Sequence, residues 1–194
     1  MPHHLIDSNI QQRFVIANIS KQIHDSQYEM LEQLVKISGC SNMQTLEIGS
    51  WTGLSAVIIG EVVQRMKGTH YCVDWFKGTS DNDGYLQETS QKYNIKERFL
   101  NNIKYFELDD TIKLIEMKSN EAVKLFDNDS LDFIFIDGDH SELGVMQDIT
   151  LWLPKLKIKK YMCGHDYLAC KPVVDKIFTI REIHNDIWYI KKGN

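Results

Sequence analysis

The stretch Leu46-Glu47-Ile48-Gly49-Ser50-Trp51-Thr52-Gly53 decides the fold, together with Asp74, which closes the next strand-like run. We interpret it as a strand, a tight glycine turn and a helix, followed by a second strand that ends in an acid. This order builds a nucleoside site at the edge of a parallel sheet. The glycines let the backbone approach a ligand closely, and the carboxylate of Asp74 can hold a ribose diol.

The glycine turn also indicates which nucleoside ligands fit. A dinucleotide fingerprint, G-x-G-x-x-G, needs its second glycine to make room for a pyrophosphate, and Trp51 stands at that position. An indole there leaves little space for a diphosphate, which disfavours NAD and FAD. A ligand with a ribose but no phosphate, such as S-adenosylmethionine, fits better.

The composition indicates a globular protein without nucleic-acid or membrane partners. A chain of 194 residues with 43% hydrophobic residues can bury a full core. Its 22 Lys and Arg against 27 Asp and Glu give a net charge of −5. This charge disfavours nucleic-acid binding, which usually needs a basic face on the protein. No apolar run reaches the roughly 18 residues that span a bilayer. The four cysteines form no C-x-x-C pair and no secretory signal is evident, so we expect a reduced, cytoplasmic protein.

Two regions differ in their hydrophobic patterns. Residues 1–40 carry apolar residues at helical spacings and predict a helical N-terminal extension. Over residues 41–194, strand-like and helical segments alternate, which predicts one α/β domain with a doubly wound, mostly parallel sheet. The expected strands are Thr45–Ile48, His70–Asp74, Ile112–Met117, Leu131–Ile136, Tyr161–Gly164 and an antiparallel edge hairpin of Ile180–Ile183 and Ile187–Ile190. The expected helices are Leu54–Met66, Tyr85–Phe106, Asn120–Leu125, Ser141–Leu156 and Val173–Phe178.

Ligands of such sheets bind beyond the carboxyl ends of the strands. The run Asp137-Gly138-Asp139-His140 follows the most buried of the predicted strands. Asp137 can bind a metal or a substrate amine there, and His140 can act as a general base at neutral pH. The alternative is that Asp139 or Ser141 only caps the next helix and that His140 is a solvated residue of its first turn.

His165-Asp166 ends the next predicted strand. Adjacent strands lie about 5 Å apart, so Asp137 and Asp166 can converge on one cation. Carboxylates and waters suit Mg²⁺, whereas an added imidazole from His165 favours Mn²⁺ or Zn²⁺. The sequence therefore predicts a divalent-metal site formed by Asp137, His165 and Asp166.

The chain resembles the class I S-adenosylmethionine-dependent methyltransferases. More narrowly, it resembles methyltransferase family 24, which is related to the catechol-type and macrolide-sugar O-methyltransferases. The resemblance runs from about residue 45 to residue 191. It is carried by Leu46-Glu47-Ile48-Gly49, Val73-Asp74-Trp75, Phe133-Ile134-Phe135-Ile136-Asp137-Gly138-Asp139-His140, Trp152-Leu153-Pro154-Lys155-Leu156 and Gly164-His165-Asp166-Tyr167.

The resemblance implies a Rossmann-like sheet of seven strands, the last of them antiparallel. It implies that Glu47 and Gly49 line the methionine end of the cofactor, that Asp74 binds the ribose and that Ser119 lies near the adenine. By the same resemblance, Asp137 and Asp166 hold Mg²⁺ and His140 serves as the base. The full set of expected cofactor contacts is Glu47, Gly49, Ser50, Trp51, Gly53, Asp74, Trp75, Ser119 and Asp137.

Two departures from the family pattern bear on these expectations. The pair after the fifth strand begins with His165 instead of an acid, so an imidazole replaces one of the acidic groups that hold the metal in the family pattern. Lys157-Ile158-Lys159-Lys160 replaces the Pro-Gly-Gly turn that often precedes the fifth strand, which should affect the loop and not the chemistry.

We therefore expect an enzyme that transfers a methyl group from S-adenosylmethionine to a small-molecule hydroxyl, with assistance from a divalent cation. The amino-terminal helices are a candidate homodimer interface. The alternatives are a non-catalytic nucleoside-binding module with the same fold and a nucleotide-binding oxidoreductase. A nucleic-acid methyltransferase is disfavoured by the acidic charge and by the lack of an Asn-Pro-Pro-aromatic motif.

Overall fold

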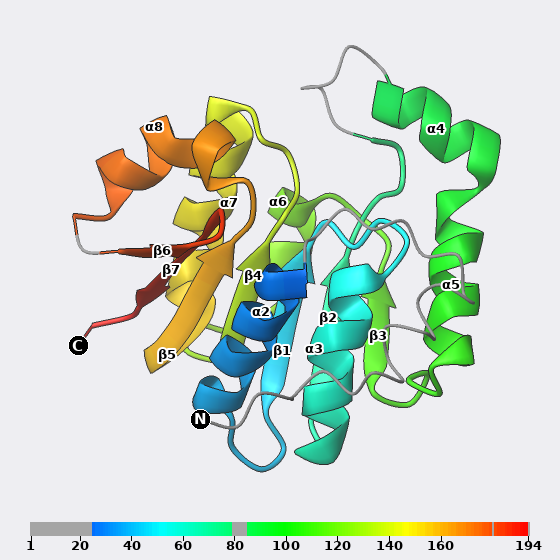
Figure 1. Ribbon diagram of the computed structural model, residues 1–194, viewed down its shortest axis with the longest axis horizontal. Coiled ribbons are helices and arrows are strands. Elements are labelled where there is room, and N and C mark those ends of the chain that lie inside the picture. Colours follow the sequence, from blue (N-terminus) through cyan, green and yellow to red (C-terminus); the bar gives the residue numbers. More distant parts are fainter. Residues whose placement is uncertain (1–24, 79–84, 180, 194) are drawn as a thin grey trace.

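A seven-stranded sheet forms the centre of the molecule (Figure 1). The computed structural model describes residues 25–78, 85–179 and 181–193. The strand order is β3-β2-β1-β4-β5-β7-β6, and β7 pairs antiparallel with both β5 and β6. The strands are β1 (Gln44–Ile48), β2 (Thr69–Val73), β3 (Ile112–Ile115), β4 (Leu131–Ile136), β5 (Leu156–Gly164), β6 (Glu182–His184) and β7 (Ile187–Lys191). The predicted doubly wound, Rossmann-like sheet with an antiparallel edge hairpin is confirmed.

Helices cover both faces of the sheet because its central strands are apolar on both sides. All six residues of β4 are buried, as expected for a central parallel strand. The helices are α2 (Asp25–Ser38), α3 (Leu54–Arg65), α4 (Tyr85–Tyr93), α5 (Ile95–Tyr105), α6 (Ser119–Ala122), α7 (Glu142–Trp152) and α8 (Tyr167–Ile177), with 3-10 turns at Val123–Leu125 and Leu153–Lys155.

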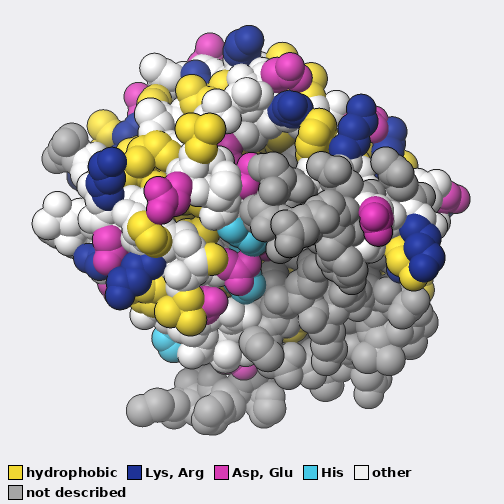
Figure 2. All heavy atoms as spheres, turned by 90° about the horizontal axis from the view of Figure 1, so that it is seen from above, with side chains coloured by type: hydrophobic (Ala, Val, Ile, Leu, Met, Phe, Trp, Pro, Cys, Tyr) yellow, Lys and Arg dark blue, Asp and Glu magenta, His cyan; other side chains and the backbone are white. Residues whose placement is uncertain are grey.

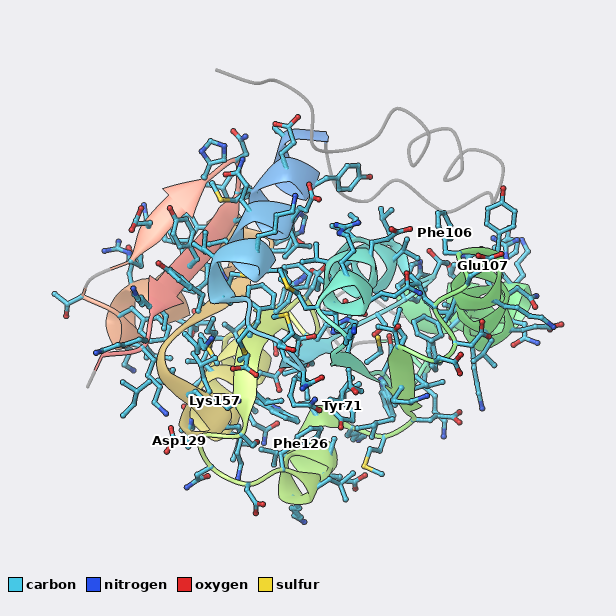
Figure 3. All side chains as sticks on the ribbon, turned by 90° about the horizontal axis from the view of Figure 1, so that it is seen from below. Tyr71, Phe106, Glu107, Phe126, Asp129 and Lys157 are labelled. Atoms are coloured by element: carbon cyan, nitrogen blue, oxygen red, sulfur yellow. The ribbon has the colours of Figure 1, made fainter. Side chains whose placement is uncertain are left out.

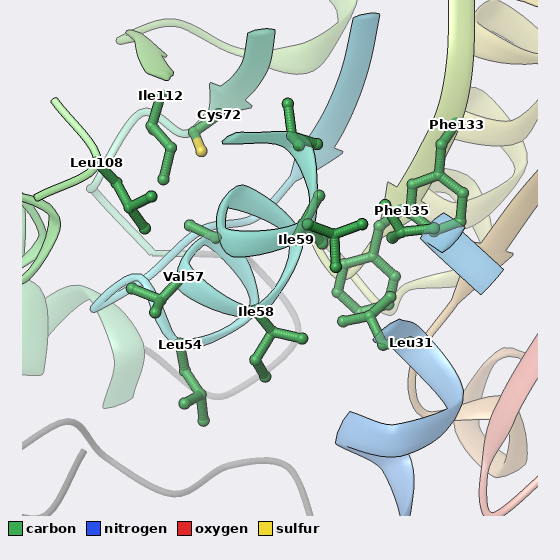
Figure 4. Close-up of a cluster of buried hydrophobic side chains, with 14 of the residues drawn as sticks. Leu31, Leu54, Val57, Ile58, Ile59, Cys72, Leu108, Ile112, Phe133 and Phe135 are labelled. Atoms are coloured by element: carbon green, nitrogen blue, oxygen red, sulfur yellow. The ribbon is translucent and has the colours of Figure 1, made fainter. Parts of the chain in front are cut away.

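Two hydrophobic clusters fill the space between the sheet and these helices. One joins α2, α3 and α5 to the sheet face that carries Cys72, Phe133 and Phe135 (Figure 4). The other joins α6, α7 and α8 to the face that carries Leu46 and Ile134. Helix α3 is buried along most of its length, which explains why its sequence is apolar nearly all round.

At the amino ends of the parallel strands, aromatic side chains pack together and ion pairs form (Figure 3). Tyr71 contacts Phe126 edge-on, with ring centroids 5.1 Å apart. The Lys157 ammonium lies 2.9 Å from the buried carboxylate of Asp132, which also accepts the Gln44 N–H. Lys157, near the start of β5, thus stabilises this end of the sheet.

Several predicted boundaries were wrong. The helix expected over Tyr85–Phe106 is two helices, because Asn94 adopts a left-handed conformation and accepts the N–H of Glu97 as the N-cap of α5. Strand β5 begins at Leu156 instead of Tyr161, and the preceding helix ends at Trp152. Helix α8 begins at Tyr167, six residues before the predicted start, and accommodates Pro172 inside.

Helix α2 confirms a helical segment before the sheet. The rest of the predicted extension, and with it part of the candidate dimer interface, lies outside the described residues. Within the described part of the chain, every helix is too short or too polar to cross a membrane.

Candidate active site

A cleft of about 750 Å³ opens at the carboxyl ends of the parallel strands. It falls in the size range of small-molecule and cofactor sites. The predicted residues that line it are Gly49, Ser50, Trp51, Asp74, Trp75, Ser119, Asp137, His140, His165 and Asp166. Viewed from above, histidine and acidic side chains gather near the centre of this face (Figure 2).

The glycine turn brings the end of β1 against the loop that follows β4. Gly49 has a φ of 84°, and a Cβ atom there would lie 2.0 Å from the backbone oxygen of Asp137. The Gly49 N–H donates to the Val73 carbonyl at 3.0 Å. A side chain at position 49 is therefore excluded by both conformation and space, and the turn depends on glycine as predicted.

Asp74 fixes the shape of the glycine turn. One of its oxygens accepts the backbone N–H groups of Ser50 and Trp51, each at 2.9 Å, and the other accepts the N–H of Phe76 at 2.7 Å. Burial raises the pKa of the Asp74 carboxyl above its usual value, while these three hydrogen bonds oppose the shift. The oxygen that accepts only the Phe76 N–H has a further lone pair, so a ribose hydroxyl can still bind there; that contact stays a prediction.

Glu47 and Gly53 do not line the cleft. Glu47 is fully buried on the face covered by α3, where its Oε2 lies 3.6 Å from His70 Nε2 and close to Cys72. A Cβ on Gly53 would meet the ring of Phe99 at 3.1 Å. Because side chains alternate along β1, the residue before Ile48 points away from the cleft wall that Ile48 forms. Direct contact of Glu47 with a cofactor therefore has no support from its position.

A cluster of imidazoles and carboxylates forms the mouth of the cleft. His140 Nε2 lies 3.4 Å from Asp137 Oδ1 and 3.3 Å from Asp166 Oδ2. His165 Nδ1 lies 3.7 Å from Asp137 Oδ1 and 3.2 Å from Asp166 Oδ2. Strands β4 and β5 are neighbours, and Ile136 pairs with Gly164, so the turns that follow them meet. The structure thus brings together the four residues that the sequence singled out at these two strand ends.

These groups change each other's proton affinity. Burial lowers the pKa of His165, but its hydrogen bond to Asp166 and the charge of the nearby carboxylates outweigh burial, so the pKa lies above its usual value. The hydrogen bond from His165 lowers the pKa of Asp166, against the opposing effect of burial. At neutral pH the cluster therefore holds an ionised carboxylate next to an imidazole with enhanced basicity.

The capping alternative is confirmed for Ser141. The Ser141 hydroxyl accepts the Gly144 N–H at 3.1 Å as the N-cap of α7, and Asp139 accepts the Ser141 N–H at 2.9 Å. His140 is nevertheless not a freely solvated residue, because it faces the carboxylates of Asp137 and Asp166. The cap holds the turn in which His140 is presented to the cleft.

Several lining residues were missed by the sequence reasoning. They come from helices α3, α6 and α7, and the most unusual is Asp148, which is only 4% exposed. It accepts a hydrogen bond from the Ser119 hydroxyl. Burial raises its pKa to about 6, with a further contribution from the charge of Asp139. An acid in the middle of a mostly apolar helix sequence was the signal that could have marked it. The other missed polar residues are Ser55, Asn120 and Gln147.

Trp75 and Lys118 line the cleft beside β2 and β3. The Trp75 indole N–H donates to the Gly78 carbonyl at 2.8 Å, and the Lys118 ammonium lies 4.5 Å from the ring centroid. The cation–π contact and the hydrogen bond fix the indole in one orientation. The predicted aromatic residue thus forms a fixed wall of the cleft.

Comparisons with known proteins agree with this geometry. A family model described as a methyltransferase domain, of methyltransferase family 24, matches residues 46–167. The O-methyltransferase NovP has 19% identity and a TM-score of 0.70, over 87% of this chain and 80% of that one. An O-methyltransferase from Bacillus cereus, solved in complex with S-adenosylhomocysteine (SAH), has 15% identity and a TM-score of 0.67, over 96% and 91% of the two chains.

A protein from Staphylococcus aureus described as a caffeoyl-CoA O-methyltransferase has 14% identity and a TM-score of 0.69, over 96% and 93% of the two chains. No curated protein sequence matches the chain. The solved structures support the fold, and the family match covers the glycine turn, Asp74 and the cluster at Asp137 and His140. The chain therefore belongs to methyltransferase family 24 and is a class I S-adenosylmethionine-dependent methyltransferase.

Proposed function

We propose that the enzyme methylates a hydroxyl group of a small molecule. The observation that carries this proposal is the position of His140, which lies within 3.4 Å of two carboxylates at the mouth of the cofactor cleft. A methyl acceptor must reach the sulfonium methyl from this mouth. A base at that place is what a hydroxyl acceptor requires, because the hydroxyl loses its proton during the transfer.

The cofactor has a consistent place in the cleft. Its ribose lies at Asp74, its methionine end at the glycine turn, and its base towards Ser119. This order leaves the sulfonium beside the place where the backbones of Gly49 and Asp137 approach closely. The methyl group then faces His140 and the acceptor.

The chemical step is an in-line displacement. The acceptor oxygen forms a bond to the methyl carbon while the carbon–sulfur bond breaks, and SAH leaves with the bonding electron pair. His140 takes the hydroxyl proton, and the charges of Asp137 and Asp166 stabilise the imidazolium that forms. The rest of the rate enhancement comes from holding the two reactants in line.

A divalent cation fits the donor set of this cluster. Ligand atoms of Asp137, His165 and Asp166 lie within 4.8 Å of one another. Two carboxylates with an imidazole suit Mn²⁺ or Zn²⁺ at least as well as Mg²⁺. A bound cation would lower the pKa of the acceptor hydroxyl and orient it.

The charge around the mouth supports a small, uncharged or cationic acceptor. Asp137, Asp139 and Asp166 all line the cleft, and the chain carries a net charge of −5. A polyanion such as a nucleic acid would be repelled from this opening. The proposal therefore keeps a small molecule as the acceptor and excludes nucleic acid.

Two measurements test the proposal. The first is calorimetric titration with SAH, with NAD as the control ligand; we expect binding of SAH that is lost in Asp74→Ala, and no binding of NAD. The second follows SAH formation from S-adenosylmethionine with catechol and simple sugars as acceptor probes, with and without Mg²⁺ or Mn²⁺. Binding of SAH without turnover on any hydroxyl acceptor would favour the non-catalytic module.

The role of His140 has its own test. His140→Ala should reduce turnover by roughly 10²–10⁴-fold while the affinity for SAH stays within a factor of two, because general-base catalysis contributes about that much. His184→Ala is the matched control, since His184 is exposed on β6, outside the cleft. Unchanged turnover in His140→Ala would exclude it as the base.

A further inference from the structure

Three ionisable side chains lie together inside the molecule, on the face of the sheet that α3 covers. Glu47 of β1 pairs with Cys72 of β2 in the parallel register, and His70 precedes Cys72 by two residues, so all three point to the same face. Each of them is 0% exposed. Figure 4 shows Cys72 within the surrounding hydrophobic cluster. A glutamate, a histidine and a cysteine thus share one fully buried site.

The polar atoms of this site lack partners. Both carboxylate oxygens of Glu47 and the Nε2 of His70 are buried, and none of them has a hydrogen-bond partner among the described residues. Glu47 Oε2 lies 3.6 Å from His70 Nε2, beyond the distance of about 2.7–2.9 Å that is usual for a hydrogen bond between charged groups. Buried polar groups are rarely left unsatisfied, so the site requires a further group between them.

Thr45 sets the orientation of the imidazole. Its hydroxyl lies 2.8 Å from His70 Nδ1 and 3.5 Å from the Thr69 carbonyl oxygen. Because a carbonyl only accepts, we assign the hydroxyl as donor to Thr69 and as acceptor of the His70 Nδ1–H. The lone pair of Nε2 then faces the Glu47 carboxylate. An imidazole whose other nitrogen donates to an oxygen is the usual arrangement of a metal ligand.

The spacing and the chemistry of the three groups fit a tetrahedral zinc ion. Ligand atoms of all three residues lie within 4.8 Å of one another. Zinc bonds of about 2.0–2.1 Å at tetrahedral angles place an oxygen and a nitrogen ligand roughly 3.3 Å apart, close to the separation of Glu47 and His70. A thiolate favours Zn²⁺ over Mg²⁺ and Ca²⁺, which take oxygen ligands. The Ser50 hydroxyl interacts with the Cys72 thiol, so it can supply the fourth donor.

We propose that Glu47, His70 and Cys72 bind a structural Zn²⁺ ion that joins β1 to β2 behind the cofactor cleft. On binding, the Cys72 thiol releases its proton to solvent and its sulfur bonds to the ion. Glu47 lies two residues before Gly49, and Cys72 lies two residues before Asp74. The ion therefore holds together the strand ends that carry the glycine turn and the ribose-binding acid.

The burial of the ligands determines how the ion enters. Because no ligand of the site is exposed, the ion binds while the chain folds and exchanges slowly afterwards. The site is separate from the cluster of Asp137, His165 and Asp166 at the mouth of the cleft, which contains no cysteine. The inference does not depend on the proposed function.

The test uses Co²⁺, which occupies zinc sites and absorbs visible light. The whole chain is unfolded in guanidinium chloride with a phosphine reductant and refolded with one equivalent of Co²⁺. Wild type should show a thiolate-to-cobalt charge-transfer band, which the mouth cluster cannot produce, and Cys72→Ser should lose it. Cys163→Ser is the matched control, because Cys163 is also 0% exposed in the same hydrophobic cluster and should leave the band unchanged.

Thr45→Val is a second variant, which keeps all three ligands. It removes only the hydroxyl that orients His70, so the charge-transfer band should remain while the affinity for Co²⁺ falls about 10–100-fold. Competition with a chelator of known affinity during refolding measures this loss. An unchanged affinity would contradict the metal role of His70.

Thermal stability gives an independent readout. Refolding wild type with Zn²⁺ instead of EDTA should raise the melting temperature by roughly 5–10 °C, as expected for a ligand at 100 times its Kd and a chain of this size. Cys72→Ser should lose most of this rise, and Cys163→Ser should keep it. An equal rise in wild type and Cys72→Ser would assign the stabilisation to the mouth cluster and overturn the inference.

Two spectroscopic outcomes would also overturn it. Refolded wild type without the charge-transfer band would mean that a proton, and not a metal, lies between Glu47 and His70. A band that persists in Cys72→Ser would assign the cobalt to another thiol. Neither outcome touches the cofactor cleft, which the titration with SAH tests separately.

Discussion

At the scale of one residue, the buried carboxyl of Asp148, which lines the cleft, lowers the stability of the folded state. Burial raises the pKa of its carboxyl to about 6, whereas an aspartate in an unfolded chain titrates near 3.9. The folded protein thus holds the proton more tightly than the unfolded chain does. The ionised carboxylate therefore destabilises the folded state above about pH 6, and this penalty disappears below about pH 4.

We expect Asp148→Asn to raise the free energy of unfolding by on the order of 2 kcal/mol at pH 7.5. The amide keeps the shape of the side chain and an oxygen for the Ser119 hydroxyl, but it carries no charge. Urea unfolding between pH 4 and pH 8 should show the gain shrinking as the pH falls, until it vanishes near pH 4. A gain that is the same at every pH would mean that the carboxylate is not the cause.

Gly49 offers a second prediction at this scale. Gly49→Ala places a Cβ 2.0 Å from the Asp137 oxygen in a left-handed backbone conformation, so we expect a loss of roughly 2–5 kcal/mol of stability and loss of SAH binding. Gly193→Ala is the matched control, since a Cβ there meets no atom within 4 Å. Thermal melts of both variants, with and without SAH, check the prediction; equal melting temperatures would contradict the close approach of the two turns.

At the scale of elements, the antiparallel strand β7 is fitted to β5 through one tight contact. Gly164 is opposite Trp188 in the register, and a Cβ on Gly164 would lie 2.5 Å from the indole. Trp188 is 1% exposed and belongs to the cluster under α7 and α8. The missing side chain in β5 thus makes room for an aromatic anchor in β7.

Gly164→Ala should cost about 1–3 kcal/mol, because overpacking forces the indole or the strand to move. Adding Trp188→Phe should recover part of that loss, since the smaller ring leaves space for the methyl group. A double-mutant cycle by urea unfolding measures the coupling between the two positions. Strictly additive losses would show that the two residues do not press on each other.

Elements were predictable where one periodicity dominates. Strand β4 is an apolar run between turn residues, and α3 is apolar nearly all round, so both were recognised from pattern. The break at Asn94 was missed because both flanking segments are helical in pattern, and only the left-handed cap separates them. The start of β5 was misplaced because three lysines between Leu156 and Tyr161 masked a strand with a polar, partly exposed beginning.

The site residues that directly follow strands were predictable from the sequence. Asp74, Asp137, His140 and Asp166 follow strands, and the sheet geometry brings them together. Asp148 lies two helical turns into α7, so only the packing of α7 against α6 places it in the cleft. Glu47 lies outside the cleft lining because a one-residue step along β1 moves a side chain to the other face of the sheet, and its contact with the cofactor stays a prediction.

At the scale of the whole molecule, the cleft depends on five strand ends and on helices from both layers. A ligand that contacts them all binds only the folded state and should stabilise it as a unit. With SAH at 100 times its Kd, we expect about 2.7 kcal/mol of added stability and a single, shifted calorimetric transition. A shift of only part of the transition would mean that the cleft spans units that unfold separately.

The central place of β1 in the sheet has a consequence for synthesis on the ribosome. Strand β1 pairs with β2 soon after it emerges, but its other partner is β4, and the hydrogen bond from Gln44 to Asp132 spans 88 residues. At about 5–20 residues per second, that edge waits roughly 4 to 18 seconds for its partner. During this interval, Leu46 and Ile48 lack the β4 side of their cover, so the nascent chain is a ready substrate for chaperones that bind short apolar strands.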